Sequence, residues 1–488
     1  MSRSARAAHA ALFLGSMSWH TLSATELHAQ PLPIQPGPNA DQALPGLAPV
    51  AGGWTAEVAG KRARKTSFDV ASKDALLAAA EARVSNAVIA FFPTLTLSGS
   101  YTRYQRVPGP NFGTLVTPEP PVAPGLLQPG TPLAAVPVTF EIPVDYWLMQ
   151  ASLAFPISDY ALRLSKQYAA ASKNADAARF DRAASEAKAV SDGKIMFYEY
   201  VMAVAQREVL IQSKLVASQH AQDASNLFRA GRVSNADVLS SEASVAAAEL
   251  AVDQADGLVQ ITEQQLRLAT HAPPSEAATI GEDVTQALPV TSYDLATLQR
   301  AALANRAELH VLLLTAAALR DSSNNGRASQ WPTVSAVGNY TYANPSPRNF
   351  LPQRDFSGYW SVGLRASWSL NDAFGGESVS NEIQARAAAV SAQFEQMRYA
   401  LRLEVTQAVV AKRTADASLV TSGAQLRAAE AAYRARRDLF ALGKSTNAEL
   451  TESEANLLRA RLAAVSARIQ QRIASIRVTH AVGLDYQQ

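Results

Sequence analysis

The chain has 488 residues, a formal net charge of +2 and no cysteine. A charge this close to neutral predicts no nucleic-acid partner, and a chain without cysteine has no disulfides, no thiol chemistry and no cysteine-linked lipid anchor. The length alone would suggest two or three domains.

The first 67 residues have the composition of an export signal followed by a linker. Arg3 and Arg6 precede a short apolar run, and Leu27-His28-Ala29 is the expected cleavage site. We therefore predict a signal peptide over residues 1–29. The proline-rich stretch that follows predicts an extended tether over residues 30–67.

Two strands separated by a long loop are predicted next. The run from Thr94 to Thr102 alternates apolar and polar residues with period two, and its expected partner runs from Trp147 to Phe155. The segment from Val107 to Pro143 between them is rich in proline. This segment is expected to form either an external rim or a disordered loop.

A helical hairpin follows the strands. From Tyr160 to His271 there is no proline, and strong helix formers dominate. Gly231 stands where a chain reversal needs a positive backbone angle. The outgoing arm, Ala161 to Arg229, should extend about 100 Å at ~1.5 Å per residue.

The second half of the chain repeats this order. The tip sequence from Phe228 to Asp237 recurs from Phe440 to Glu449, as Phe-x-x-Gly-basic-x-x-Asn-Ala-acidic. The strand regions also recur, at Pro332 to Tyr340 and at Trp360 to Asp372, with Ser361 to Leu370 alternating most cleanly. Solenoid repeats span only ~20–50 residues, so a repeat this long indicates a duplicated half-protein. We assign the two repeats to residues 68–285 and 286–488.

The strands suit a membrane better than the helices do. Charges occur on nearly every turn of the helices, and no run of about 18 uncharged apolar residues exists. The strands have one apolar face and aromatic residues near their ends, which is typical of outer-membrane β-barrel strands. Soluble hairpins packed on a helix bundle would show the same pattern.

The number of strands bears on the oligomeric state. One chain supplies four such strands, and an open sheet edge cannot stay unpaired in hydrocarbon. Strands of other chains must therefore complete the sheet. Two copies would give eight strands around a filled interior, and three would give twelve around a lumen. A homotrimer is thus the smallest useful channel.

The region from about Phe68 to Leu484 resembles the TolC family of outer-membrane efflux proteins. The resemblance rests on the order of the elements, on the doubled tip pattern and on the segment from Ala304 to Leu309. That segment is similar to the family's Asn-Arg-Pro-Glu-Leu opening of the second half, with Ala307 in place of the proline.

This resemblance implies a mainly α fold with transmembrane β structure. Three copies would form a twelve-stranded β-barrel in the outer membrane above a twelve-helix α-barrel in the periplasm. The trimer would be the passive exit duct of a tripartite efflux pump or a type I secretion system. Its expected partners are a periplasmic adaptor, an inner-membrane transporter and outer-membrane lipid.

The resemblance also implies a periplasmic gate. Glu449 and Glu452 lie three apart, on one helix face. They match positions where the family places acidic residues around the entrance, although a solvated pair at a helix start is the alternative. Asp237, near Arg232 or Lys444, is expected to supply the closing contacts between hairpins.

The hairpin tips are expected to seat the adaptor, or else only to make the turn. The residues concerned are Phe228, Gly231, Arg232, Val233, Phe440, Gly443, Lys444 and Ser445. Two of them depart from the family pattern. Phe440 lacks the hydroxyl that some members use as a latch, and Ser445 stands where some carry an arginine.

No enzyme site, metal site or cofactor is predicted. The seven histidines include no pair at helical ligand spacing, and the carboxylates are mostly dispersed along helix faces. A periplasmic adaptor is the alternative function, but it would have one hairpin rather than two. A coiled-coil scaffold would instead show sustained apolar heptads.

Overall fold

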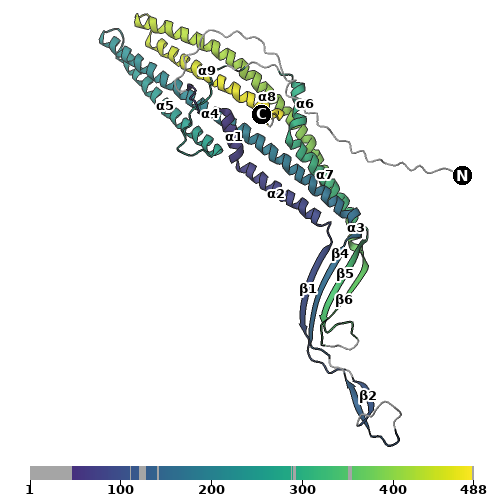
Figure 1. Ribbon diagram of the computed structural model, residues 1–488. Coiled ribbons are helices and arrows are strands. Elements are labelled where there is room, and N and C mark those ends of the chain that lie inside the picture. Colours follow the sequence, from purple (N-terminus) through teal and green to yellow (C-terminus); the bar gives the residue numbers. More distant parts are fainter. Residues whose placement is uncertain are drawn as a thin grey trace, which may run out of the picture.

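The computed structural model describes residues 47–109, 111–119, 128–139, 142–286, 288, 293–349 and 354–485. These residues form an elongated molecule, with a long helical bundle and a sheet at one end of it (Figure 1). The predicted signal peptide, residues 1–29, lies outside the described residues. The mainly α fold is confirmed.

Both predicted helical hairpins are present. The first half contains α1 (Ala56–Thr66), α2 (Phe68–Ile89), α3 (Ile157–Asp159), the π-helical turn η3 (Tyr160–Leu164), α4 (Ser165–Arg229) and α5 (Asn235–Thr270). The second half contains α6 (Leu295–Asn305), α7 (Ala307–Ala328), α8 (Leu370–Ala441) and α9 (Asn447–Val482). Helix α4 has 65 residues and α8 has 72, so each extends about 100 Å.

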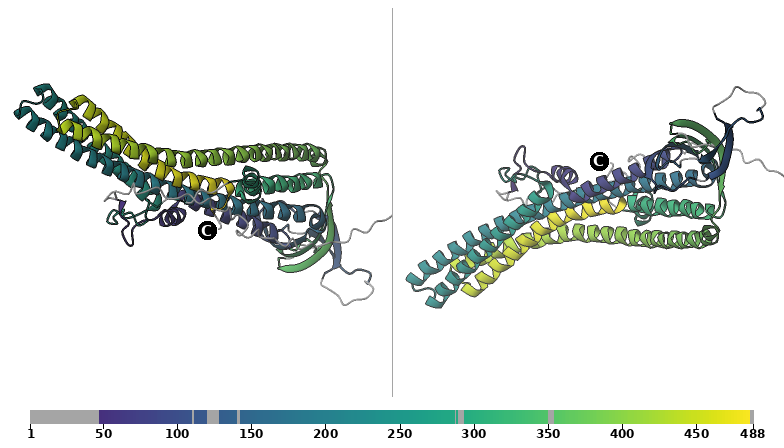
Figure 2. Two further views of the ribbon diagram at one scale, coloured as in Figure 1. Left: turned by 90° about the horizontal axis from the view of Figure 1, so that it is seen from above. Right: turned by 90° about the horizontal axis from the view of Figure 1, so that it is seen from below.

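The helices that follow the two turns, α5 and α9, are shorter than α4 and α8, and other short helices pack along the rest of α4 and α8. Helices α5 and α9 have 36 residues each and therefore accompany only part of α4 and α8. Nearer the sheet, α2 packs on α4, and α7 lies between α4 and α8. The result is a bundle of long helices side by side that bends along its length (Figure 2).

The tether predicted over residues 30–67 is wrong for its last part. From residue 47 onward the chain is described and folded: Trp54 is buried, and its backbone N–H donates to the Thr279 carbonyl at 2.7 Å. Helix α1 then packs on α4 through small residues, Ala59 and Ala63, which let the two helices approach closely. The tether was predicted from the prolines between Pro31 and Pro49, and these end before α1 begins at Ala56.

The four predicted strands form one antiparallel sheet. They are β1 (Thr94–Arg103), β4 (Asp145–Phe155), β5 (Thr333–Asn344) and β6 (Ser357–Ser367), in the order β1-β4-β5-β6. The fourth strand was predicted to extend to Leu370, but β6 ends at Ser367 and Leu370 begins α8. The Ser369 side chain accepts a hydrogen bond from the Asp372 N–H and so caps the helix.

The sheet leaves its apolar side chains uncovered. Leu97 is 74% exposed, and Val362 and Leu364 are each 75% exposed. In the described part of the chain, no further strand pairs with the outer edge of β1 or of β6. One chain therefore presents an apolar surface and two open edges.

The long loop of the first half contains structure that the sequence did not predict. Two strands, β2 (Asn111–Pro118) and β3 (Leu133–Thr139), pair as a hairpin beyond the main sheet (Figure 1). Prolines discouraged a strand prediction here, but Pro118 ends β2, and both strands of a two-stranded sheet are edge strands, where proline is tolerated.

The core lies where the two halves of the chain meet. One buried cluster joins Phe197 and Val201 of α4 to Ile469 and Ile473 of α9. A second cluster joins α6, α8 and the end of α9. No single described helix is long and apolar enough to cross a membrane, although the bent pair α6–α7 passes that test of length and composition.

Candidate functional site at the hairpin tips

Both hairpins turn with the same backbone geometry. Gly231 and Gly443 have φ values of 75° and 73°, as predicted. In the first hairpin the Gly231 N–H donates to the Phe228 carbonyl at 2.8 Å, and the Arg232 N–H to the Leu227 carbonyl at 2.9 Å. The second hairpin repeats both bonds with the same lengths. This arrangement satisfies the last carbonyls of each long helix.

Each return helix then begins with a capping box. Ser234 accepts a hydrogen bond from the Asp237 N–H at 3.2 Å, and the Asp237 carboxylate accepts one from the Ser234 N–H at 2.9 Å. Thr446 and Glu449 form the same pair of bonds, at 3.2 and 3.1 Å. The acidic residue of the tip pattern therefore has a local structural role.

Hydrogen bonding lowers the pKa of both capping carboxylates. For Asp237 the donors are the Ser234 hydroxyl and then the Ser234 N–H. For Glu449 they are the Ser445 hydroxyl and then the Thr446 N–H. Both groups are therefore ionised at neutral pH.

The two predicted gate carboxylates have different surroundings. Glu449 turns back onto the helix start, with Ser445 Oγ at 2.7 Å and Arg436 Nη1 at 3.3 Å. Glu452 lies on the exposed surface of α9, outside the capping box. Only Glu452 thus presents a carboxylate that is not committed to the helix start.

The expected partners of Asp237 do not contact it within one chain. Arg232 and Lys444 are exposed, and neither forms an ion pair with Asp237 in the described part of the chain. Val233 is half-buried beside them. A contact of Asp237 with a hairpin of another copy stays a prediction.

A buried asparagine joins the two tips. Asn447 Nδ2 donates to the Asp237 carbonyl at 3.3 Å, and the Ser241 hydroxyl, which also donates to that carbonyl, lies 3.3 Å from Asn447 Oδ1. Asn447 is 6% exposed and Ser241 is 1% exposed. The asparagine recurs in both copies of the tip pattern, but the sequence alone indicates no role for Asn447.

A histidine and a glutamate form a second link between the hairpins. His220 Nδ1 of α4 lies 3.2 Å from Glu454 Oε2 of α9, and the His220 ring packs edge-on against Phe440. Burial lowers the pKa of His220, but the hydrogen bond to Glu454 and its negative charge outweigh this and raise it. Sequence reasoning missed this pair, because its members lie in different halves without any shared motif.

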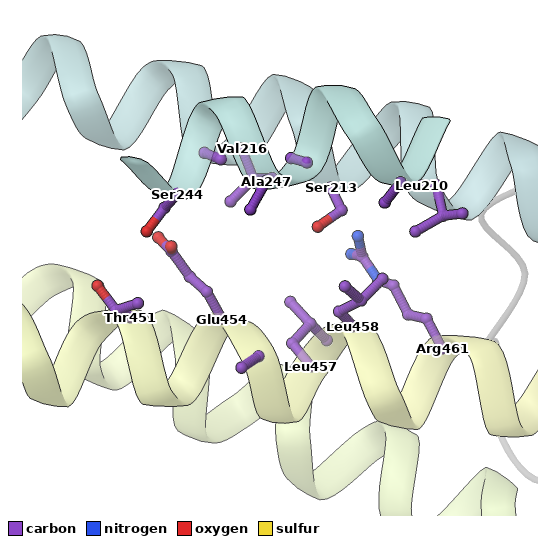
Figure 3. Close-up of a pocket in the computed structure, with 14 residues that line it drawn as sticks. Leu210, Ser213, Val216, Ser244, Ala247, Thr451, Glu454, Leu457, Leu458 and Arg461 are labelled. Atoms are coloured by element: carbon purple, nitrogen blue, oxygen red, sulfur yellow. The ribbon is translucent and has the colours of Figure 1, made fainter. Parts of the chain in front are cut away.

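An apolar groove lies between the hairpins next to this pair. Its volume is about 250 Å³, and helices α4, α5 and α9 line it. Figure 3 shows Glu454 and Arg461 reaching into it from α9, with Leu457 and Leu458 between them. Among the described residues, no three His, Asp or Glu side chains could hold a metal ion together.

Comparisons with known proteins agree with this architecture. Residues 59–271 and 298–484 match the family model described as outer membrane efflux protein. Among solved structures, the outer-membrane channel OprN matches with a TM-score of 0.70 at 17% identity, over 93% of this chain and 98% of that one. CusC matches with a TM-score of 0.71 at 15% identity, over 93% and 99% of the two chains.

A third similar structure is the CmeC outer membrane channel of Campylobacter jejuni, with a TM-score of 0.69 at 14% identity, over 93% of this chain and 94% of that one. At these identities the three structures show a shared fold. No curated protein sequence matches this chain.

Proposed function

The chain belongs to the outer membrane efflux protein family and is an outer-membrane exit duct, and from this premise we propose that three copies assemble into one passive channel. The carrying observation is the four-stranded sheet with an open edge on β1 and on β6. The alternative of a periplasmic adaptor is not favoured, because the family match covers both halves of the chain.

Strand direction supports closure between copies. Each neighbouring pair in the order β1-β4-β5-β6 is antiparallel, so β1 and β6 run in opposite directions. Strand β6 of one copy can then pair with β1 of the next and continue the antiparallel pattern. Three copies would give a closed barrel of twelve strands, wide enough for a lumen. The exposed Leu97, Val362 and Leu364 would face lipid.

The helices would extend the channel into the periplasm. Three copies of α4, α5, α8 and α9, with the shorter helices completing their length, would form a twelve-helix tunnel. In one chain the long helices already lie side by side, with α5 next to α4, α4 next to α9 and α9 next to α8. Energy for export would come from an inner-membrane transporter, which reaches the duct through a periplasmic adaptor.

The tips would form the periplasmic entrance. Glu449 and Glu452 from three copies would place six carboxylates around one axis, where like charges repel unless cations bridge them. Asp237 would help to hold neighbouring hairpins closed. Replacing Asp237 by Ala should raise the resting conductance in planar bilayers, and an unchanged conductance would remove it from the gate.

The adaptor would dock on the same tips. Val233 is the cleanest position for a test, because Ser445 also bonds to Glu449. Val233→Trp should abolish export while the trimer still forms. Leu76→Trp, an exposed position of α2 far from the tips, is the control and should leave export intact. If the Val233 variant exports as well as the control, the tips do not dock the adaptor and only form the turns.

The β2–β3 hairpin would lie outside the cell, because barrels of this type keep their longer loops there. Protease added to intact cells should cut between Val107 and Pro143 and nowhere along the helices. Cleavage only after the outer membrane is breached would reverse the proposed orientation.

Fractionation and reconstitution test the function as a whole. The chain should sediment with the outer membrane on a density gradient, and the purified protein should carry ionic current in a planar KCl bilayer. Recovery as a soluble periplasmic protein that carries no current would contradict the proposal.

A further inference from the structure

Equivalent residues of the two tips are covered to very different degrees. Phe440 is 5% exposed, whereas Phe228, its equivalent in the tip pattern, is 44% exposed. Asn447 is buried, whereas Asn235 is exposed. The same residue types occur in both copies, so composition does not explain the difference. The second tip is therefore covered by a neighbouring element within the chain, and the first tip has no such cover among the described residues.

The same contrast recurs further along the return helices. Ile473 of α9 is 2% exposed and shares a buried cluster with Phe197 and Val201 of α4. Its equivalent in α5, Ile261, is 57% exposed. Helix α4 of the first half therefore covers α9 of the second half.

The duplication identifies what would cover the first half. Helix α8 is the repeat equivalent of α4, and α5 is the equivalent of α9. Within a chain, α9 contacts α4 along its length and α5 at the tips, and we call this contact the intrachain seam. Its repeat equivalent is a contact of α5 with α8 and, at the tips, with α9. Within one chain α5 and α8 lie on opposite outer sides, with α4 and α9 between them (Figure 1). Only α8 of a second copy can reach α5.

We propose that α5 of one copy and α8–α9 of the next form an interchain seam in which Asn235 and Ser453 repeat the contact of Asn447 and Ser241. This inference rests on the trimer proposed above and gives its interface a residue register. Ser453 is the equivalent of Ser241, and Glu449 is the equivalent of Asp237. The Asn235 amide would thus donate to the Glu449 carbonyl of the next copy.

The two seams differ in one respect. The intrachain seam has the buried pair His220 and Glu454. Their equivalents are Ala432 and Glu242, both exposed in the single chain. The interchain seam therefore lacks the ionic hydrogen bond.

Two cysteine pairs test the seams, since the chain has no cysteine of its own. Asn235→Cys with Ser453→Cys probes the interchain seam, and Ser241→Cys with Asn447→Cys probes the intrachain seam. Each full-length protein is bridged with a short bis-methanethiosulfonate reagent and run on a denaturing gel. The first pair should give covalent dimers and trimers, and the second should stay monomeric with its thiols consumed. Each single-cysteine variant is the control and should give no covalent oligomers.

If native mass spectrometry shows three copies but the interchain pair gives no covalent oligomer, the register is wrong while the trimer stands. A single copy per particle would contradict the proposed function itself.

Discussion

At the residue scale, most residues of the repeated tip pattern end one helix or begin the next. Gly231 and Gly443 adopt the positive φ that the turn requires, and Asp237 and Glu449 complete capping boxes. The turn glycines could be predicted from the sequence because their conformation is local. The capping boxes were not predicted: the alternative to a gate for Glu449 and Glu452 was a solvated pair at a helix start.

Glu452 should contribute more to ion selectivity than Glu449. The Glu449 carboxylate is bonded to the helix start and lies 3.3 Å from Arg436, whereas Glu452 is exposed outside the capping box. In planar bilayers with a KCl gradient, Glu452→Ala should therefore shift the reversal potential toward zero more than Glu449→Ala. Equal shifts, or the reverse order, would show that the capped carboxylate faces the ions.

The turn glycine should be needed for its backbone conformation alone. No atom lies within 4 Å of a Cβ added at Gly443, so Gly443→Ala meets strain from φ of 73° and no clash. We expect a loss of about 1 kcal/mol in the free energy of unfolding. The control is Gly423→Ala inside α8, which should stabilise by up to about 1 kcal/mol. Denaturant titration of both variants measures this difference, and a loss at both positions would refute the role of φ.

His220 should make the stability of the bundle depend on pH. Its pKa is raised above 6.5 in the folded state, because the hydrogen bond and charge of Glu454 outweigh the opposing effect of burial. The pair therefore stabilises fully below pH 6.5, and this contribution is lost as the pH rises through the folded pKa. The melting temperature of the native chain should fall over that range, and His220→Gln should remove this part of the fall. His310→Gln is the control and should retain it.

At the element scale, the helices and strands that depend on local periodicity and composition could be predicted from the sequence. Both long hairpins and the four strands of the main sheet follow from local patterns. The errors lie where tertiary contacts decide: α1 is held by α4, and the β2–β3 hairpin forms despite its prolines. The His220–Glu454 link could not be predicted, since it depends on how α4 and α9 are aligned.

Arg306 should hold together the break between α6 and α7. Its guanidinium is buried and lies 2.8 Å from both Glu308 and Glu404, and it also donates to the His480 carbonyl at 3.3 Å. Arg306→Ala removes the cation shared by two partly exposed carboxylates and a donor to the His480 carbonyl, which should cost about 1–3 kcal/mol of unfolding free energy. Arg300→Ala, an exposed arginine of α6, should change it by less than about 0.5 kcal/mol. Equal losses in denaturant titration would contradict the role of Arg306.

At the scale of the whole molecule, the described part of the chain leaves several surfaces open. These are two sheet edges, an apolar sheet surface and one hairpin tip that no described residue covers. The duplication could be predicted from the sequence, because the tip pattern and the strand regions occur twice. The recurrence of an intrachain contact between chains could not, because it depends on which helices lie next to one another in the folded chain. In the proposed trimer, a second copy of the chain covers the surfaces that one copy leaves open.

The number of chains in the membrane particle tests this account most directly. The protein is extracted from outer membranes in mild detergent, and its mass is measured by native mass spectrometry. The account predicts particles of three copies, in which β6 of each chain pairs with β1 of the next. Particles of one copy, stable and still able to carry current in a planar bilayer, would contradict it.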